Sequence, residues 1–241
     1  MENAATESAP RIGLIGRMIR VFYVPRETFE AVAASRTAID WVAPAAVSAI
    51  VALVAAVAIM PLAMEEGAKA IQEQMQGQEL SDEQREMMEK MAGPGQAIGL
   101  VMAPVGSFVV LFISALLLLG AGRIAGADVG YSGMLTVSAY SSLVQALKGI
   151  IVTPLMLSKK SMEVHTGLGL LLPTEMMNSF TGRFLAGIEI FTVWQVVIVA
   201  VGISALGNVD TRKALVPVLV LSLIWLMIAA GLGGLQQMGT R

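Results

Sequence analysis

Long runs of apolar residues alternate with short polar segments along most of this chain. Five runs are long enough to cross a bilayer, because a helix rises about 1.5 Å per residue and the hydrocarbon layer is about 30 Å thick. These five runs cover residues 41–63, 98–120, 134–157, 184–206 and 214–235. Lipid offers the backbone no hydrogen-bond partners, so each run is expected to be a helix. The pattern predicts an all-α integral membrane protein with a five-span helical bundle over residues 41–235.

The segment before the first run, residues 1–40, carries a different pattern. Over residues 11–24, four apolar residues share one face of a helical wheel and two arginines lie opposite. The apolar residues are Ile12, Ile15, Ile19 and Phe22, and the arginines are Arg17 and Arg20. A basic amphipathic helix that stops before Pro25 is typical of a segment lying in the membrane interface. A helix packed against the inner surface of the bundle fits the same pattern, and both interpretations stay open.

The connection between the first two runs, residues 64–97, is long and acidic. Apolar residues at helical spacing over 64–75 predict a first helix in it. Residues 81–84 (Ser-Asp-Glu-Gln) fit a capping box that opens a second helix. A helical hairpin or bent helix is therefore expected on the outer face. The short tail over 236–241 follows the fifth run.

Lysines and arginines near the span ends predict the orientation of the bundle. Five arginines precede the first span, at positions 11, 17, 20, 26 and 36. They favour a cytoplasmic N-terminus, and five spans then place the C-terminus outside.

Composition supports the membrane assignment and excludes several classes of function. The chain is 56% hydrophobic and 14% charged, whereas soluble domains carry about 25% charged residues. A net charge of −2 excludes an electrostatic nucleic-acid binder. The chain has no cysteine, so disulfides, thiolate metal sites and cysteine nucleophiles are excluded. No phosphate-binding loop, dinucleotide fingerprint or zinc-protease motif occurs, and no cofactor is expected.

A polar stripe runs along the third span. Its members fall within about 120° on a helical wheel. They are Ser138, Ser141, Ser142, Gln145, Lys148 and Gly149, and Tyr140 is grouped with them as a candidate. A stripe of this kind must face protein or water rather than lipid.

Glu189 is a carboxylate inside the fourth apolar run, at a depth that the Lys148 side chain can reach. A charged group there is costly unless it has a partner. We therefore predict a Lys148–Glu189 interaction between the third and fourth spans. One interpretation is an ion pair that fixes helix register, and the other is a proton or ion relay.

Residues 130–133 (Gly-Tyr-Ser-Gly) match the Gly-x-Ser-Gly pattern of rhomboid-type intramembrane proteases. That chemistry needs a histidine within hydrogen-bond reach of Ser132. The single histidine, His165, falls in a loop predicted on the far side of the membrane, so these residues are interpreted as a tight turn leading into the third span. His165 lacks metal ligands at suitable spacing, and the outer methionines are interpreted as an adaptable apolar face. Neither a catalytic nor a metal residue is predicted.

Two segments at the start of the chain resemble those of the Yip family of membrane proteins. Residues 24–29, with Pro25 and Phe29, resemble the Pro-x-x-x-Phe segment that precedes the first span in bacterial members. Residues 40–44 are similar to the Asp-Leu-Tyr-Gly-Pro motif of eukaryotic members and keep Asp40 and Pro44.

Two later segments strengthen the resemblance. Residues 139–143 (Ala-Tyr-Ser-Ser-Leu) look like the family's Gly-Tyr-Ser segment in the third span. Glu189, Phe191 and Trp194 resemble the acidic-x-Phe-x-x-Trp start of its fourth span. The order and placement of the four segments cover roughly residues 12–235.

The resemblance implies a five-span, non-enzymatic protein. In eukaryotes the family binds prenylated Rab-type GTPases in early secretory membranes. The long outer loop is more similar to bacterial members, which implies a bacterial inner membrane. The expected function is a membrane scaffold or adaptor with lipid and protein partners, and small residues in the first and fifth spans are compatible with a homo-oligomer. The alternative is a small transporter or channel that uses the stripe and Glu189.

Overall fold

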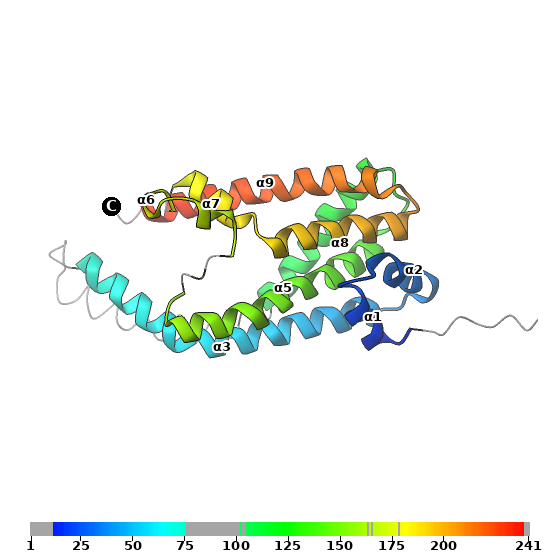
Figure 1. Cartoon of the computed structure of the whole chain (residues 1–241). Coiled ribbons are helices and arrows are strands. Elements are labelled where there is room, and N and C mark those ends of the chain that lie inside the picture. Colours follow the sequence, from blue (N-terminus) through cyan, green and yellow to red (C-terminus); the bar gives the residue numbers. More distant parts are fainter. Residues whose placement is uncertain are drawn as a thin grey trace, which may run out of the picture.

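The computed structural model describes residues 12–75, 102, 105–162, 164, 166–177 and 179–238. Within these ranges, five helices are long and apolar enough to cross a membrane. They belong to α3 (Ile39–Met75), the helix Val105–Ile124, α5 (Tyr131–Lys159), α8 (Ile190–Gly207) and α9 (Thr211–Met238). The predicted fold class, an all-α bundle with five spans, is confirmed (Figure 1).

Tight connections make consecutive spans neighbours at one end of the bundle. Gly126 adopts a φ of 80° between the helix Val105–Ile124 and α5, and Asn208 adopts a φ of 50° between α8 and α9. The Ser204 hydroxyl donates to the Val209 carbonyl at 2.6 Å, which closes the second turn. The segments before α3 lie at this same end, and the last turns of α9 lie at the other (Figure 1).

The N-terminal segment forms two short helices at that end, α1 (Leu14–Arg20) and α2 (Pro25–Ser35). The helix predicted over 11–24 is therefore shorter, and Pro25 opens α2 as its first residue because proline is tolerated in a first helical turn. α2 packs against α8.

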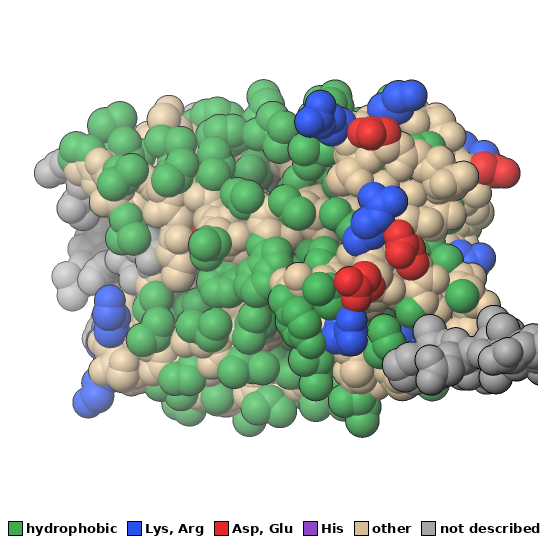
Figure 2. Space-filling model, turned by 45° about the vertical axis from the view of Figure 1, so that its right-hand side comes forward, with side chains coloured by type: hydrophobic (Ala, Val, Ile, Leu, Met, Phe, Trp, Pro, Cys, Tyr) green, Lys and Arg blue, Asp and Glu red, His purple; other side chains and the backbone are tan. Residues whose placement is uncertain are grey.

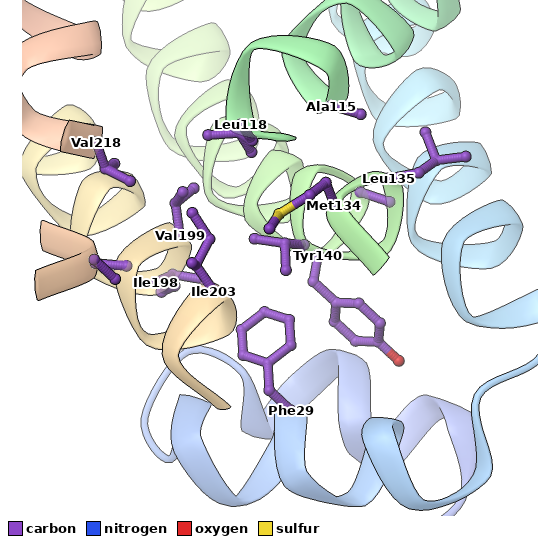
Figure 3. Packing of buried hydrophobic residues seen from close by; sticks show 14 of the residues in the cluster. Phe29, Ala115, Leu118, Met134, Leu135, Tyr140, Ile198, Val199, Ile203 and Val218 are labelled. Carbon is purple, nitrogen blue, oxygen red and sulfur yellow. The ribbon is translucent and has the colours of Figure 1, made fainter. Parts of the chain in front are cut away.

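A fully buried side chain, Phe29, anchors α2 in the core. Its ring meets the Tyr140 ring edge-on at 5.7 Å between centroids. A Cβ at Gly202 of α8 would lie 2.9 Å from Phe29 Cζ, so the absence of a side chain there makes room for the ring. Met134, Ile198 and Ile203 continue the same core between α5 and α8 (Figure 3).

The outer surface is mostly apolar. Figure 2 shows hydrophobic side chains over most of one face, with acidic and basic side chains gathered mainly toward the end that holds α1 and α2. Exposed Val220, Ile224 and Trp225 of α9 belong to this apolar surface. A surface of this kind suits a bilayer rather than water.

The fourth predicted span, residues 184–206, is not one continuous helix. α7 (Phe180–Gly187) ends before Ile188, and α8 begins only at Ile190. Between them Glu189 has extended backbone angles and forms an isolated antiparallel bridge with Gly167. The Leu168 N–H donates to the Ile188 carbonyl at 3.0 Å, so this part of the chain pairs with a distant segment instead of continuing the helix.

The other span boundaries differ less from the prediction. α3 continues through Met75, as the apolar spacing over 64–75 predicts. The predicted second helix of the outer hairpin, with its capping box at 81–84, lies outside the described residues. The segment between α5 and α8 contains the short helices η1 (Leu168–Leu171) and α6 (Thr174–Met177) before α7.

Candidate functional site

The structure brings Lys148 and Glu189 together. Lys148 Nζ donates to Glu189 Oε1, and the Thr166 hydroxyl donates to Glu189 Oε2. The Glu189 side chain is 9% exposed, whereas that of Lys148 is 31% exposed. We call these three residues the Glu189 node. The predicted contact is present, and its role remains a proposal.

Local structure explains where Glu189 lies. It is the N-cap residue of α8, so its predicted place inside a continuous helix is wrong. An acidic side chain is favourable beside a helix N-terminus, where unpaired N–H groups carry partial positive charge. The Gly167 bridge brings the neighbouring Thr166 to the carboxylate.

A second polar contact joins α5 to α8. The Gln145 side-chain amide donates to the Gln195 side-chain carbonyl at 2.7 Å, and Gln145 is exposed. Gln195 and Thr166 were not among the predicted residues. Gln195 could have been found as a second strongly polar side chain in the fourth apolar run. Thr166 gave no signal, because it lies in a connection that only the folded chain brings to Glu189.

The remaining stripe residues turn toward different neighbours. Ser142 and Ser48 of α3 share a hydrogen bond at 2.9 Å. Ser138 donates to the Leu111 carbonyl at 3.4 Å, and buried Ser141 donates to the Ser138 carbonyl of its own helix at 2.9 Å. Through these side chains the stripe contacts α3, α8 and the helix Val105–Ile124.

A second ion pair lies at the end of the bundle that holds α1. Arg17 NH1 donates to Asp40 Oδ1 at 2.7 Å, and the Thr37 N–H and hydroxyl donate to Asp40 Oδ2 at 2.9 and 3.1 Å. The Asp40 side chain is 1% exposed and that of Arg17 is 13% exposed. We call these residues the Asp40 node. The helical wheel placed Arg17 opposite the apolar face of this segment, and the buried Asp40 carboxylate holds that side chain against the bundle.

Tyr140 lies fully buried beside Phe29 (Figure 3). Its hydroxyl has no hydrogen-bond partner within the described ranges. A buried hydroxyl without a partner costs free energy, so the ring rather than the hydroxyl is what the core uses.

The remaining residues that resemble Yip family motifs are packed inside the protein. Pro44 is buried near the start of α3, and Phe191 is buried in the first turn of α8. Trp194 meets Phe22 edge-on at 5.6 Å between ring centroids. These residues join the N-terminal segment and the spans into one core.

The protease-like pattern begins α5 itself, so the predicted tight turn before the span is wrong for residues 131–133, which are already helical. Gly130 is the N-cap residue and Ser132 is exposed in the first turn. His165 lies outside the described residues. Among the side chains that the structure describes, no group of three or more His, Cys, Asp or Glu residues could hold a metal ion.

Five apolar spans and an apolar surface define a polytopic α-helical membrane protein. The Yip1 domain family model matches residues 19–233, and the chain belongs to this family. The comparisons with curated proteins and with solved structures gave no match.

Proposed function

We propose that this protein is a non-enzymatic membrane scaffold or adaptor that organises partner proteins or lipids in the bilayer. The proposal is based on one observation: buried polar side chains form hydrogen bonds and ion pairs that connect separate segments of the chain. The two carboxylates that are buried among the described residues, Asp40 and Glu189, have each oxygen engaged by a neighbouring donor. Groups held in this way stabilise a fixed shape, which is what a scaffold requires.

The proposed orientation has a cytoplasmic N-terminus in a bacterial inner membrane. The five N-terminal arginines support it through the positive-inside rule. The end with α1 and α2 would then face the cytoplasm, and the outer loop over 64–97 would face the opposite side.

A small transporter or channel is the second candidate. It is favoured by the exposure of Gln145 and by the 31% exposure of Lys148, since these polar groups reach the surface of the bundle. The scaffold is favoured by Ser142 and Ser138, because these stripe residues form hydrogen bonds with two different helices.

The test is site-specific crosslinking in membranes at native expression. Photoreactive groups at exposed Arg36 and Asp128 would sample the end near α1, and one at exposed Val220 of α9 serves as the lipid-facing control. The scaffold proposal expects defined protein or lipid adducts at 36 and 128 that differ from those at 220. The same unselective lipid adducts at all three positions would contradict it.

A further inference from the structure

The polarity of α1 is inverted relative to that of a surface helix in water. Its cationic Arg17 points into the bundle and is 13% exposed. Ile15 and Ile19 point outward with 70% and 56% of their surfaces exposed, and Tyr23 just beyond the helix is 66% exposed. Burial of charge with exposure of large aliphatic side chains is unfavourable in water and favourable in an apolar medium.

α1 has three distinct sides. The bundle side carries Arg17, together with Met18, which packs against the core. The polar side carries Arg20, which pairs with exposed Glu27 at 2.6 Å. The third side carries Ile15 and Ile19. A helix with these three sides fits the line where a protein, hydrocarbon and the polar headgroup region meet.

The side of α1 that carries Ile15 and Ile19 is apolar, like the neighbouring surface of the membrane-spanning helix α3. Asp40, which holds Arg17, lies in the first turn of α3, and its neighbours Ile39 and Val42 are exposed apolar residues. α3 is one of the five helices apolar enough to span the bilayer. The lipid that surrounds α3 therefore provides the nearest apolar medium for α1.

We propose that Ile15, Ile19 and Tyr23 insert into the bilayer leaflet on the α1 side, and that phospholipid is the occupant of this surface. The Arg17–Asp40 pair fixes the rotation of α1 that presents these residues to lipid. Tyr23 supplies the amphipathic ring that is typical of membrane interfaces. The inference rests on the proposed function and names lipid as one partner of the scaffold.

The cysteine-free chain allows a direct test with single spin labels. Ile15→Cys and Ile19→Cys place labels on the inferred lipid side, and Glu30→Cys places a matched control on the exposed side of α2. The full chain is reconstituted in phosphatidylcholine bilayers. Collision rates are then measured with oxygen, which partitions into lipid, and with a water-soluble nickel complex.

The proposal expects a shift toward oxygen at 15 and 19 and toward nickel at 30. Nickel accessibility at 15 and 19 equal to that at 30 would overturn it. Protection of 15 and 19 from both reagents would also overturn it, because a second copy or another protein would then cover the surface. Either result leaves the scaffold proposal to be judged by the adducts at 36 and 128, so the two failures are distinguishable.

Thr37→Val supplies a second readout within the Ile19→Cys background. It removes one hydroxyl donor from Asp40 and keeps the Arg17 contact. The label at 19 is expected to stay on the lipid side. Asp40→Asn weakens the ion pair itself, and a shift of the label toward nickel in a protein that still folds is expected. An unchanged label in a folded Asp40→Asn protein would contradict the role of the pair.

Discussion

The Asp40 node and the Glu189 node are built alike and differ in burial. In each, one carboxylate oxygen accepts from a cationic side chain and the other accepts from a threonine hydroxyl. Asp40 and its cation are both nearly sealed from the surroundings, whereas Lys148 keeps 31% of its side chain exposed. Similar chemistry should therefore contribute differently to stability, because an unpaired charge costs most where solvent cannot reach it.

The two nodes also join different parts of the chain. The Asp40 node ties a peripheral helix, α1, to the start of α3. The Glu189 node ties α5 and the connection at Thr166 to a break between α7 and α8. Loss of the first should release a helix, and loss of the second should distort a local bend.

The largest expected effect is that of Asp40→Ala. It leaves Arg17 buried without its carboxylate, and loss of one partner of a buried pair costs about 3–5 kcal/mol. Denaturation in detergent micelles should show this loss. The double variant Arg17→Met with Asp40→Leu should recover most of it. If Asp40→Ala lowers the unfolding free energy by less than about 1 kcal/mol, the Asp40 node behaves like a solvent-exposed ion pair and not like a buried one.

Gly167→Ala should come next. The new Cβ would lie 2.2 Å from the Ala186 carbonyl oxygen, so backbone must move and the bridge to Glu189 is strained. A loss of about 3 kcal/mol is expected in the same unfolding experiment. Gly231→Ala in α9 meets nothing within 4 Å and is the matched control. Equal stability of the two variants would show that the bend is not tightly packed.

Disruption of the Lys148–Glu189 pair should cost less, about 1–2 kcal/mol for Lys148→Met, because the remaining Glu189 carboxylate keeps the Thr166 hydroxyl and the N-terminus of α8 as favourable neighbours. Lys148→Glu with Glu189→Lys should fold better than either single variant. Recovery should be partial, since a lysine at the α8 N-terminus opposes the helix dipole. If the charge-swapped protein is no more stable than the single variants, the Lys148–Glu189 pair does not stabilise the fold.

Tyr140→Phe should have the smallest effect. The phenol has no partner among the described residues, while the ring packs on Phe29. Unfolding free energy should be unchanged or slightly raised, within about 0.5 kcal/mol. A clear loss of stability would mean that the hydroxyl contributes a hydrogen bond within the membrane.

Hydropathy and helical spacing were sufficient to predict the five spans and the approach of Lys148 to Glu189. They could not predict the break at Glu189, because residues 188–190 (Ile-Glu-Ile) lie inside a predominantly apolar run of membrane-spanning length without a helix-breaking proline. The break depends on backbone pairing with residues 167–168, which are distant in sequence. A long-range backbone contact leaves no local pattern.

The orientation of the Arg17 side chain toward the bundle could not be predicted for a different reason. A helical wheel separates the faces of α1 but does not say which face meets the bundle. Asp40 decides this by accepting from Arg17, and the two residues are far apart in sequence. Their shared role becomes visible only once α1 and α3 are placed together.

The central claim is that the polar stripe of α5 joins helices and does not line a water path. Ser141→Cys and Gln145→Cys in the cysteine-free chain test it with a charged, membrane-impermeant thiol reagent applied from each side. Ser132→Cys, at the exposed start of α5, is the reactive control. The account predicts slow labelling at 141 and 145 and rapid labelling at 132. Labelling of 141 and 145 as rapid as that of 132 would contradict it and favour a transport pathway.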